Sequence, residues 1–159
     1  MTLYIRQKVF TLVDSYSIYD RCNSPVFNVK KQLFSFPPKF YIYDQNGFEL
    51  MRLEKNFTLF LASYEIFQGE RHLASVQKEL SFLNSRFSIK SGFGSYTIDG
   101  EIFNYDFSIS KDGFLIGRVH KELLSWGDSY VLDIEDNQSA EFFCALVIAI
   151  DNCIHNKNN

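Results

Sequence analysis

Four lysines recur at one position of a repeated pattern, and no other side chains in this sequence are better placed to do chemistry. They are Lys31, Lys55, Lys78 and Lys121. Ammonium groups gathered in a ring could face a phosphate or a lipid headgroup. The alternative is structural, because such lysines could also extend to a rim, pair with carboxylates or bind the last carbonyls of a helix. The adjacent Lys30 is included in the candidate lipid- or anion-binding set.

The pattern that carries these lysines spans fourteen residues and occurs without gaps. An aliphatic residue comes first, lysine third, an aromatic residue twelfth and Ile or Leu last. A degenerate copy, IRQKVFTLVDSYSI, runs from Ile5 to Ile18 with its lysine shifted to Lys8. The clean copies are VKKQLFSFPPKFYI (29–42), LEKNFTLFLASYEI (53–66), VQKELSFLNSRFSI (76–89) and VHKELLSWGDSYVL (119–132). Five chance matches are improbable, so the chain is built from repeats.

Within each copy the apolar residues alternate with polar ones, which is typical of β-strands. Turns are expected at Asn46-Gly47, Gln68-Gly69, Asp99-Gly100 and Asp112-Gly113, and a connection at Pro37-Pro38. The expected strands lie near residues 3–10, 15–20, 26–33, 39–44, 48–56, 62–67, 72–80, 86–90, 95–99, 102–110, 114–121 and 129–134. An antiparallel meander of about twelve strands tends to close into a barrel, because closure removes exposed edges.

Strand periodicity predicts where the lysines point. Each shares its parity with the apolar residues of its copy, so strict alternation directs all four toward the inside of the barrel, unless a bulge reverses it. Ammonium groups cannot lie dry and unpaired in a core. The prediction is therefore that they either cap the barrel or bind an anion, and both alternatives stay open.

The last element differs in kind, because residues 140–154 read AEFFCALVIAIDNCI. Apolar residues cover every side of this predicted helix, so it should be surrounded by protein. The apolar run from Phe142 to Ile150 is well short of the roughly twenty residues that span a bilayer. We predict a central helix over about 138–154 that fills the barrel, begun by Asp136, Asn137 or Ser139 and followed by a frayed tail at 155–159.

Composition agrees with one all-β domain over residues 1–159. The chain has 159 residues, 17% of them aromatic, and only eight glycines and three prolines. The net charge of −3 gives no support for nucleic-acid binding. Three cysteines argue against a disulfide framework, and the first residues lack the apolar core of a signal peptide. The expected compartment is the cytoplasm, with peripheral membrane contact and no transmembrane segment.

No catalytic or metal-binding motif emerges from the remaining polar residues. His72, His120 and His155 have no ligand spacing. The acidic run from Asp133 to Asn137 lacks the glycine and the glutamate of a calcium loop, and helix capping explains it better. We therefore predict no catalytic residue, no metal and no cofactor.

Several segments resemble the bacterial members of the LURP-one-related family, within the tubby C-terminal-like superfamily. They are VQKELSFLNSRFSI, the stretch IDGEIFNYDFSISKDG at 98–113, WGDSYVLDI at 126–134, and the terminal helix. The resemblance covers essentially the whole chain. It implies a twelve-stranded barrel around a buried C-terminal helix. Tubby domains bind phosphoinositides and phospholipid scramblases act on membranes, but no segment here matches tubby's phosphoinositide-binding residues, so no site is carried over.

Two functions follow as expectations. The first is a non-enzymatic barrel that binds anionic phospholipid headgroups peripherally through its lysines. The alternative is a protein-interaction or regulatory domain without a lipid or small-molecule ligand, which would use aromatic residues opposite the inward face, such as Tyr41 and Tyr43. An enzyme is not expected, because a helix in the lumen leaves little room for a substrate.

Overall fold

The computed structural model describes residues 1–6, 15–32, 34–57, 62–79, 86–124 and 127–155. Twelve strands are followed by one α-helix, α2 (Ala140–His155). The strands are β1 (Thr2–Arg6), β2 (Ser15–Tyr19), β3 (Pro25–Gln32), β4 (Lys39–Tyr43), β5 (Glu49–Phe57), β6 (Ala62–Gln68), β7 (Arg71–Glu79), β8 (Arg86–Ser91), β9 (Tyr96–Glu101), β10 (Asp106–Lys111), β11 (Phe114–Leu124) and β12 (Gly127–Ile134). The 3-10 helix η1 (Ile102–Asn104) lies between β9 and β10.

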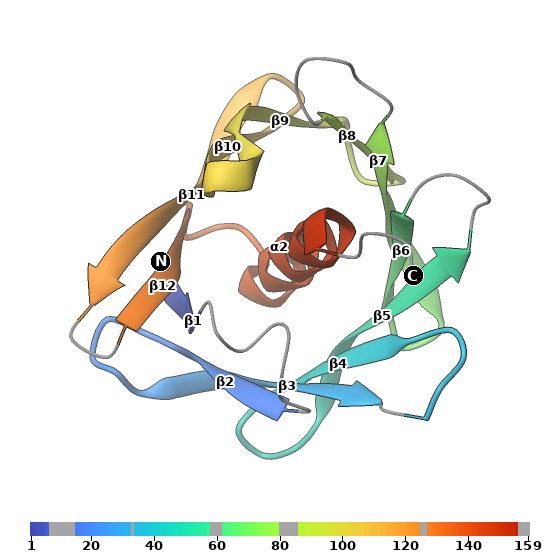
Figure 1. The fold of residues 1–159 in the computed structure, drawn as a ribbon, viewed down its shortest axis with the longest axis horizontal. Coiled ribbons are helices and arrows are strands. Elements are labelled where there is room, and N and C mark those ends of the chain that lie inside the picture. The colour runs from blue at the N-terminus through green and yellow to red at the C-terminus, as the bar shows by residue number, and fades with distance from the viewer. Residues whose placement is uncertain (7–14, 33, 58–61, 80–85, 125–126, 156–159) are drawn as a thin grey trace.

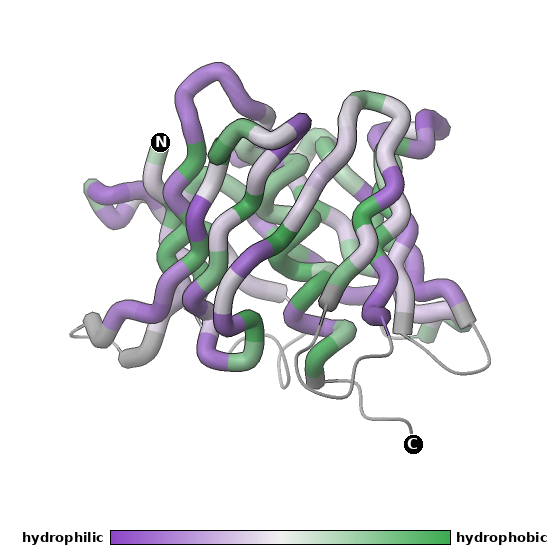
Figure 2. The backbone as a smooth tube through the Cα atoms, turned by 90° about the horizontal axis from the view of Figure 1, so that it is seen from above, coloured by the Kyte–Doolittle hydropathy of each residue, from purple (hydrophilic) through white to green (hydrophobic). Residues whose placement is uncertain are grey.

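The strands form a closed antiparallel barrel in which each strand pairs with its neighbours in sequence (Figure 1). Closure comes from β1 and β12, whose register places Leu3 opposite Leu132. The side view alternates hydrophilic and hydrophobic positions along the strands (Figure 2), as expected for a sheet with one buried face. The predicted fold class, a barrel of about twelve strands around a C-terminal helix, is confirmed.

Each clean repeat is one β-hairpin. Its first and last residues face each other, as Val29 and Ile42 do, and its third and twelfth residues also face each other. The same register recurs in β5–β6, β7–β8 and β11–β12. A fourteen-residue pattern therefore encodes a pairing register, because residues an equal number of steps from the turn meet across an antiparallel pair.

Helix α2 runs through the lumen and forms the centre of the core (Figure 1). Every residue from Phe142 to Ile150 is buried. Of the three predicted capping residues Ser139 takes the role, since its Oγ accepts a hydrogen bond from the Phe142 N–H (3.3 Å). Gly117 of β11 lets the helix approach closely, because a Cβ there would lie 3.1 Å from the Phe143 ring.

Two predictions near Gly100 are wrong. The chain does not turn at Asp99-Gly100, and the strand predicted over 102–110 begins at Asp106. Both residues of the pair lie inside β9, and the chain turns at η1 and Tyr105, whose φ is 54°. Gly100 is required there for another reason: its φ is +132°, and a Cβ would lie 2.4 Å from the Asp106 carbonyl oxygen. Glycine marks a close approach of two backbones at this position, not a turn.

The other predicted boundaries agree with the structure to within a few residues, as far as residues are described. The connection at Pro37-Pro38 lies between β3 and β4 as expected. The predicted first strand extended to residue 10, and residues 7–10 lie outside the described part of the chain, as do 156–159 of the predicted tail. His155, placed in that tail, is the last residue of α2. Within the described residues no helix has the length and apolarity that crossing a bilayer requires.

Candidate functional site

The four repeat lysines lie at one end of the barrel, where β3, β5, β7, β11 and α2 finish. This end is called the lysine end. The register confirms the predicted parity, because each lysine lies opposite a buried aromatic residue of the following strand. The pairs are Lys31 with Phe40, Lys55 with Tyr64, Lys78 with Phe87, and Lys121 with Tyr130. Lys31, Lys55 and Lys78 lie on every second strand, about 10 Å apart along the rim, whereas Lys121 on β11 is four strands away from Lys78 and from Lys31.

Two of these lysines lie against the end of the central helix. Burial raises the pKa of the Cys153 thiol to about 12, and the ammonium groups of Lys55 and Lys78 partly oppose that rise. Both lysines are therefore close to the last turn of α2. A helix C-terminus carries a partial negative charge, so cations at this position are favourable. The capping role predicted for the lysines stays a prediction for Lys55 and Lys78.

The other two lysines are more accessible to solvent. Lys31 and Lys121 are exposed, whereas Lys55 and Lys78 are partly buried. The Lys31 ammonium lies 6.0 Å from the centre of the Phe40 ring, and that of Lys78 lies 5.4 Å from the Phe103 ring. Contact with aromatic faces allows the stems to cross apolar surface while the charged groups reach the rim.

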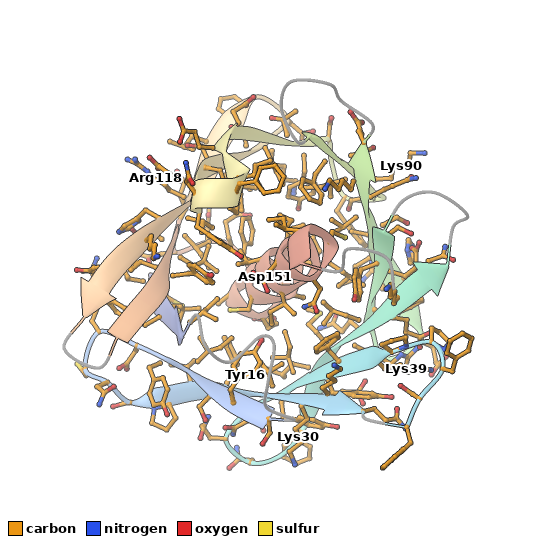
Figure 3. All side chains as sticks on the ribbon, viewed as in Figure 1. Tyr16, Lys30, Lys39, Lys90, Arg118 and Asp151 are labelled. Atoms are coloured by element: carbon orange, nitrogen blue, oxygen red, sulfur yellow. The ribbon has the colours of Figure 1, made fainter. Side chains whose placement is uncertain are left out.

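Lys30 does not join the other four. It lies on the outer face of β3, opposite Ser15 and Tyr41, with its ammonium 5.3 Å from the Tyr43 ring (Figure 3). It lines an open groove of about 740 Å³ together with residues of β2, Tyr43 and the β4–β5 turn. The structure thus divides the candidate lysines into an inner set of four and one outer residue.

A ring of aromatic side chains, here called the aromatic collar, lies beneath the lysines. Each of the six hairpins contributes one member: Tyr16, Phe40, Tyr64, Phe87, Tyr105 and Tyr130. Phe40 and Tyr64 contact each other with ring centroids 6.2 Å apart. Tyr105 stacks on Tyr130 at 3.8 Å. The collar separates the charged rim from the aliphatic core around the middle of α2.

A carboxylate lies inside this collar. Asp151 of α2 is 1% exposed and accepts a hydrogen bond from the Tyr105 hydroxyl. Burial and the nearby Asp151 carboxylate raise the pKa of Tyr105 far above its usual range. The same two causes, in the same order, raise the pKa of Tyr16, which points from β2 toward the helix (Figure 3). The hydrogen bond from Tyr105 to Asp151 thereby ties α2 to the β9–β10 hairpin.

Asp151 and Tyr105 are not among the candidate residues predicted from the sequence. The available signal was a lone carboxylate directly after the apolar run of a helix predicted to be buried on all sides. A carboxylate in such a place needs hydrogen-bond donors. Which donors it finds depends on the tertiary structure, because Tyr105 is far from it in sequence.

Exposed aromatic residues also gather at the lysine end. The connection from β3 to β4 carries Phe34, which is 100% exposed, and Phe36, which is 86% exposed. Phe103 of η1 is 55% exposed at the same end. The sequence analysis treated the first two only as members of a repeat, because alternation does not show that a residue lies beyond the end of its strand.

The histidines form no metal centre or catalytic triad in the described residues. His72 Nε2 meets both Glu65 Oε2 (2.6 Å) and Ser75 Oγ (3.3 Å). A triad needs the two imidazole nitrogens to serve different partners, so this cluster cannot relay a proton from serine. His120 Nδ1 lies 3.8 Å from Asp133 Oδ2. Within the described ranges no three His, Cys, Asp or Glu side chains are grouped as metal ligands.

A closed twelve-stranded antiparallel barrel with a hydrophobic helix through its lumen is the tubby C-terminal-like fold. The family model described as LURP-one-related matches residues 1–151, and this chain belongs to that family. It is 31% identical over 154 residues to the uncharacterized protein YxjI of Bacillus subtilis (strain 168), with 97% of this chain and 94% of the relative covered.

A solved structure shares the fold at much lower sequence identity. It is the X-ray structure of a protein from Arabidopsis thaliana, with a TM-score of 0.67 and 15% identity. The match covers 95% of this chain and 88% of that one. At this identity the likeness concerns the fold alone.

Proposed function

We propose that this protein is a non-enzymatic module that binds anionic phospholipid headgroups peripherally through its lysine end. The observation that carries the proposal is the placement of Lys31, Lys55, Lys78 and Lys121 on the inner face of one barrel rim. A lysine close to an anionic bilayer contributes about 1 kcal/mol of binding free energy. Four on one rim therefore supply an affinity that a net charge of −3 alone would not suggest.

The distribution of charge supports a defined orientation. The end of the barrel where α2 begins, here called the helix-start end, comprises the turns at 20–24, 44–48, 69–70, 92–95, 112–113 and 135–139. These turns carry the carboxylates Asp20, Asp44, Glu70, Asp112, Glu135 and Asp136. At the lysine end, Glu54, Glu79 and Glu122 have the outward parity and the lysines the inward one. An anionic surface would thus attract the inner rim and repel the opposite end.

The absence of an enzymatic activity is part of the proposal. Helix α2 occupies the lumen, where a barrel of this size would otherwise bind a small molecule. The grooves among the described residues are open and lie on the outer wall or at a rim. An exposed free thiol, Cys22, agrees with a reducing compartment, so the proposed location is the cytoplasmic face of a membrane.

Vesicle flotation tests the proposal directly. Neutral and anionic vesicles are compared at low and at physiological salt, with wild-type protein and a variant in which Lys31, Lys55, Lys78 and Lys121 are changed to Gln. We expect binding to anionic vesicles that weakens with salt and is lost in the variant. A matched control changes Arg21, Arg71, Lys90 and Lys111 to Gln, which removes the same charge away from the lysine end. Circular dichroism and thermal melts confirm that all three proteins fold.

Two results contradict the proposal. One is the absence of wild-type binding under every condition, and the other is an equal loss of binding in the control variant. The single change Lys30→Gln tests whether the outer lysine belongs to the site. We expect it to leave vesicle binding unchanged, because its ammonium lies over Tyr43 on the outer wall.

A protein-interaction domain is the second candidate, and one observation favours it. Tyr41 and Tyr43 stack on the outer face of β4, with ring centroids 6.2 Å apart and planes at 24°. Aromatic side chains beside a groove are common at protein interfaces. A Tyr41→Ser, Tyr43→Ser variant that binds vesicles normally but loses a protein partner would favour this function.

A further inference from the structure

We infer that the β3–β4 connection is a hydrophobic wedge that inserts Phe34 and Phe36 into the boundary between headgroups and acyl chains. The inference rests on the proposed function and adds a second, apolar contribution to it. It also orients the protein, since one hairpin of the rim would enter the bilayer while the lysines remain among the headgroups.

These two rings are largely exposed to water. Phe34 is 100% exposed and Phe36 is 86% exposed, whereas Phe40, on the next strand, is 4% exposed. Burying a phenylalanine side chain contributes about 1.5–3 kcal/mol. Because Phe34 and Phe36 are not buried in the core, this free energy remains available when the rings enter another apolar environment, such as the interior of a bilayer.

The chain presents the wedge on a defined support. The Ser35 hydroxyl donates a hydrogen bond to the Gln32 carbonyl (3.1 Å), and the Lys55 N–H donates one to the Pro38 carbonyl (3.0 Å). Pro37 and Pro38 each fix one backbone dihedral. The connection is thus tied to both β3 and β5, so that its insertion costs little conformational entropy.

Charge complementarity identifies the apolar phase as an anionic bilayer. Lys31 is the last residue but one of β3, before the wedge, and its side chain is exposed. Lys39 begins β4 after the wedge, where its ammonium is paired with Glu54 (3.0 Å). Phenylalanines flanked by lysines suit a surface with anionic headgroups above and acyl chains below.

Exposed phenylalanines at the helix-start end have different neighbours. Phe48, 69% exposed, follows a turn in which Asp44 accepts its N–H (2.8 Å). Phe114, 75% exposed, follows Asp112, and the Phe93 ring is covered by the Arg71 guanidinium at 4.4 Å. Carboxylates beside Phe48 and Phe114 oppose contact with an anionic surface, so these residues serve as controls.

Fluorescence measures insertion. Phe34→Trp is compared with Phe114→Trp, each in a protein in which the native Trp126 is changed to Phe so that only the introduced indole is observed. With anionic vesicles, Phe34→Trp should shift its emission to the blue and be quenched by lipids brominated on their acyl chains. Phe114→Trp should show neither change. Equal responses of the two variants, or none in Phe34→Trp while the protein is bound, would overturn the wedge.

Binding measurements separate the wedge from the lysines. The variant Phe34→Ser, Phe36→Ser should keep its salt-sensitive attraction at low salt and lose about tenfold or more of its affinity at physiological salt. The matched control is Phe48→Ser, Phe114→Ser, which should bind as the wild type does. Undiminished binding by the wedge variant would remove the inference and leave the proposed function intact, whereas a wild type that binds no vesicles would remove both.

A second copy of the chain is the competing occupant. Sedimentation without vesicles tests this alternative. A dimer in the wild type that dissociates in the Phe34→Ser, Phe36→Ser variant would show that the rings cover a partner molecule, and the wedge would then be rejected. A monomer in both proteins agrees with the wedge.

Discussion

The two ends of the barrel use charged residues differently. At the helix-start end carboxylates hold turns together: Asp20 Oδ1 accepts the N–H groups of Cys22 and Ser24, and Asp112 Oδ1 accepts the Ser95 N–H (2.8 Å). At the lysine end two ammonium groups lie beside the last helical turn and two are exposed. At the helix-start end these carboxylates accept hydrogen bonds that stabilise the turns, whereas at the lysine end part of the positive charge remains accessible for binding.

This polarity follows from the repeat. Every clean copy of the repeat forms a hairpin whose connection lies at the same end of the barrel. The lysine at its third position and the aromatic residue at its twelfth position therefore lie near that end in each copy. Repetition multiplies one lysine into an inner rim and one aromatic residue into five of the six members of the collar, and the sixth, Tyr105, follows η1. The helix-start end is made by the links between copies, which are not constrained to resemble one another.

Both ends depend on the helix that joins them, and its disruption should have the largest effect. Ala149→Asp places a carboxylate at a fully buried position of α2, and we expect loss of folding because a buried unpaired charge costs several kcal/mol. Glu141→Gln, in the partly exposed first turn, should change stability by less than about 1 kcal/mol. Circular dichroism and chemical denaturation measure both. A cooperatively folding Ala149→Asp protein would contradict the central-helix core.

Single lysine changes should divide the lysine end into two classes. Lys31→Gln and Lys121→Gln should weaken binding to anionic vesicles roughly fivefold each at low salt, with little change in melting temperature, because both residues are exposed. Lys55→Gln and Lys78→Gln should also lower the melting temperature, because they remove cations from the end of α2. Identical effects of all four changes would refute the division.

Removing the tyrosine hydroxyl of the buried hydrogen bond at the lysine end should lower the free energy of unfolding more than removing a tyrosine hydroxyl at the helix-start end. Tyr105→Phe removes the donor to Asp151 and should cost about 1–3 kcal/mol of unfolding free energy in urea denaturation. Tyr96, near the start of α2, packs its ring on Phe142 with centroids 5.7 Å apart. Tyr96→Phe keeps this packing and should cost less than about 1 kcal/mol. The reverse order would mean that Asp151 contributes little to the orientation of the helix.

The smallest expected effect concerns pH. Burial raises the pKa of Cys153 to about 12 from 9.0, against the opposing effect of Lys55 and Lys78. In the unfolded chain the thiol ionises near pH 9, while in the folded protein it keeps its proton. Its contribution is therefore complete below pH 9 and falls by up to about 1.4 kcal/mol per pH unit as the pH rises toward 12.

Denaturation curves from pH 8 to pH 10 measure this loss. Cys153→Ser should reduce it, whereas Cys22→Ser, at the helix-start end, should leave the pH profile unchanged because Cys22 is exposed. An unchanged slope in Cys153→Ser would show that other groups account for the alkaline loss.

Local patterns predicted much of the architecture. Alternation located the twelve strands, the repeat encoded their hairpin register, and the apolar run of α2 required a surrounding barrel. The prediction failed at Asp99-Gly100, because a glycine needed for a close backbone approach has the same appearance in a sequence as a glycine needed for a turn.

The candidate site was predicted less completely. Parity placed Lys31, Lys55, Lys78 and Lys121 on the inner face, but it could not show which lie beside the helix and which are exposed. The candidate set also contained Lys30, which lies on the outer face of β3, the face its parity indicates. Strand parity also could not predict that Phe34 and Phe36 are exposed, because their exposure depends on where β3 ends.

The sequence by itself therefore determined the elements, their pairing and the single end toward which the repeats direct their lysines, because these follow from periodicity along the chain. Only the tertiary structure decided that Asp151 meets Tyr105, that the six aromatic residues form a collar, and that Phe34 and Phe36 remain in solvent. These features join residues distant in sequence, or depend on the packing of a helix in a lumen, and local periodicity carries no information about either.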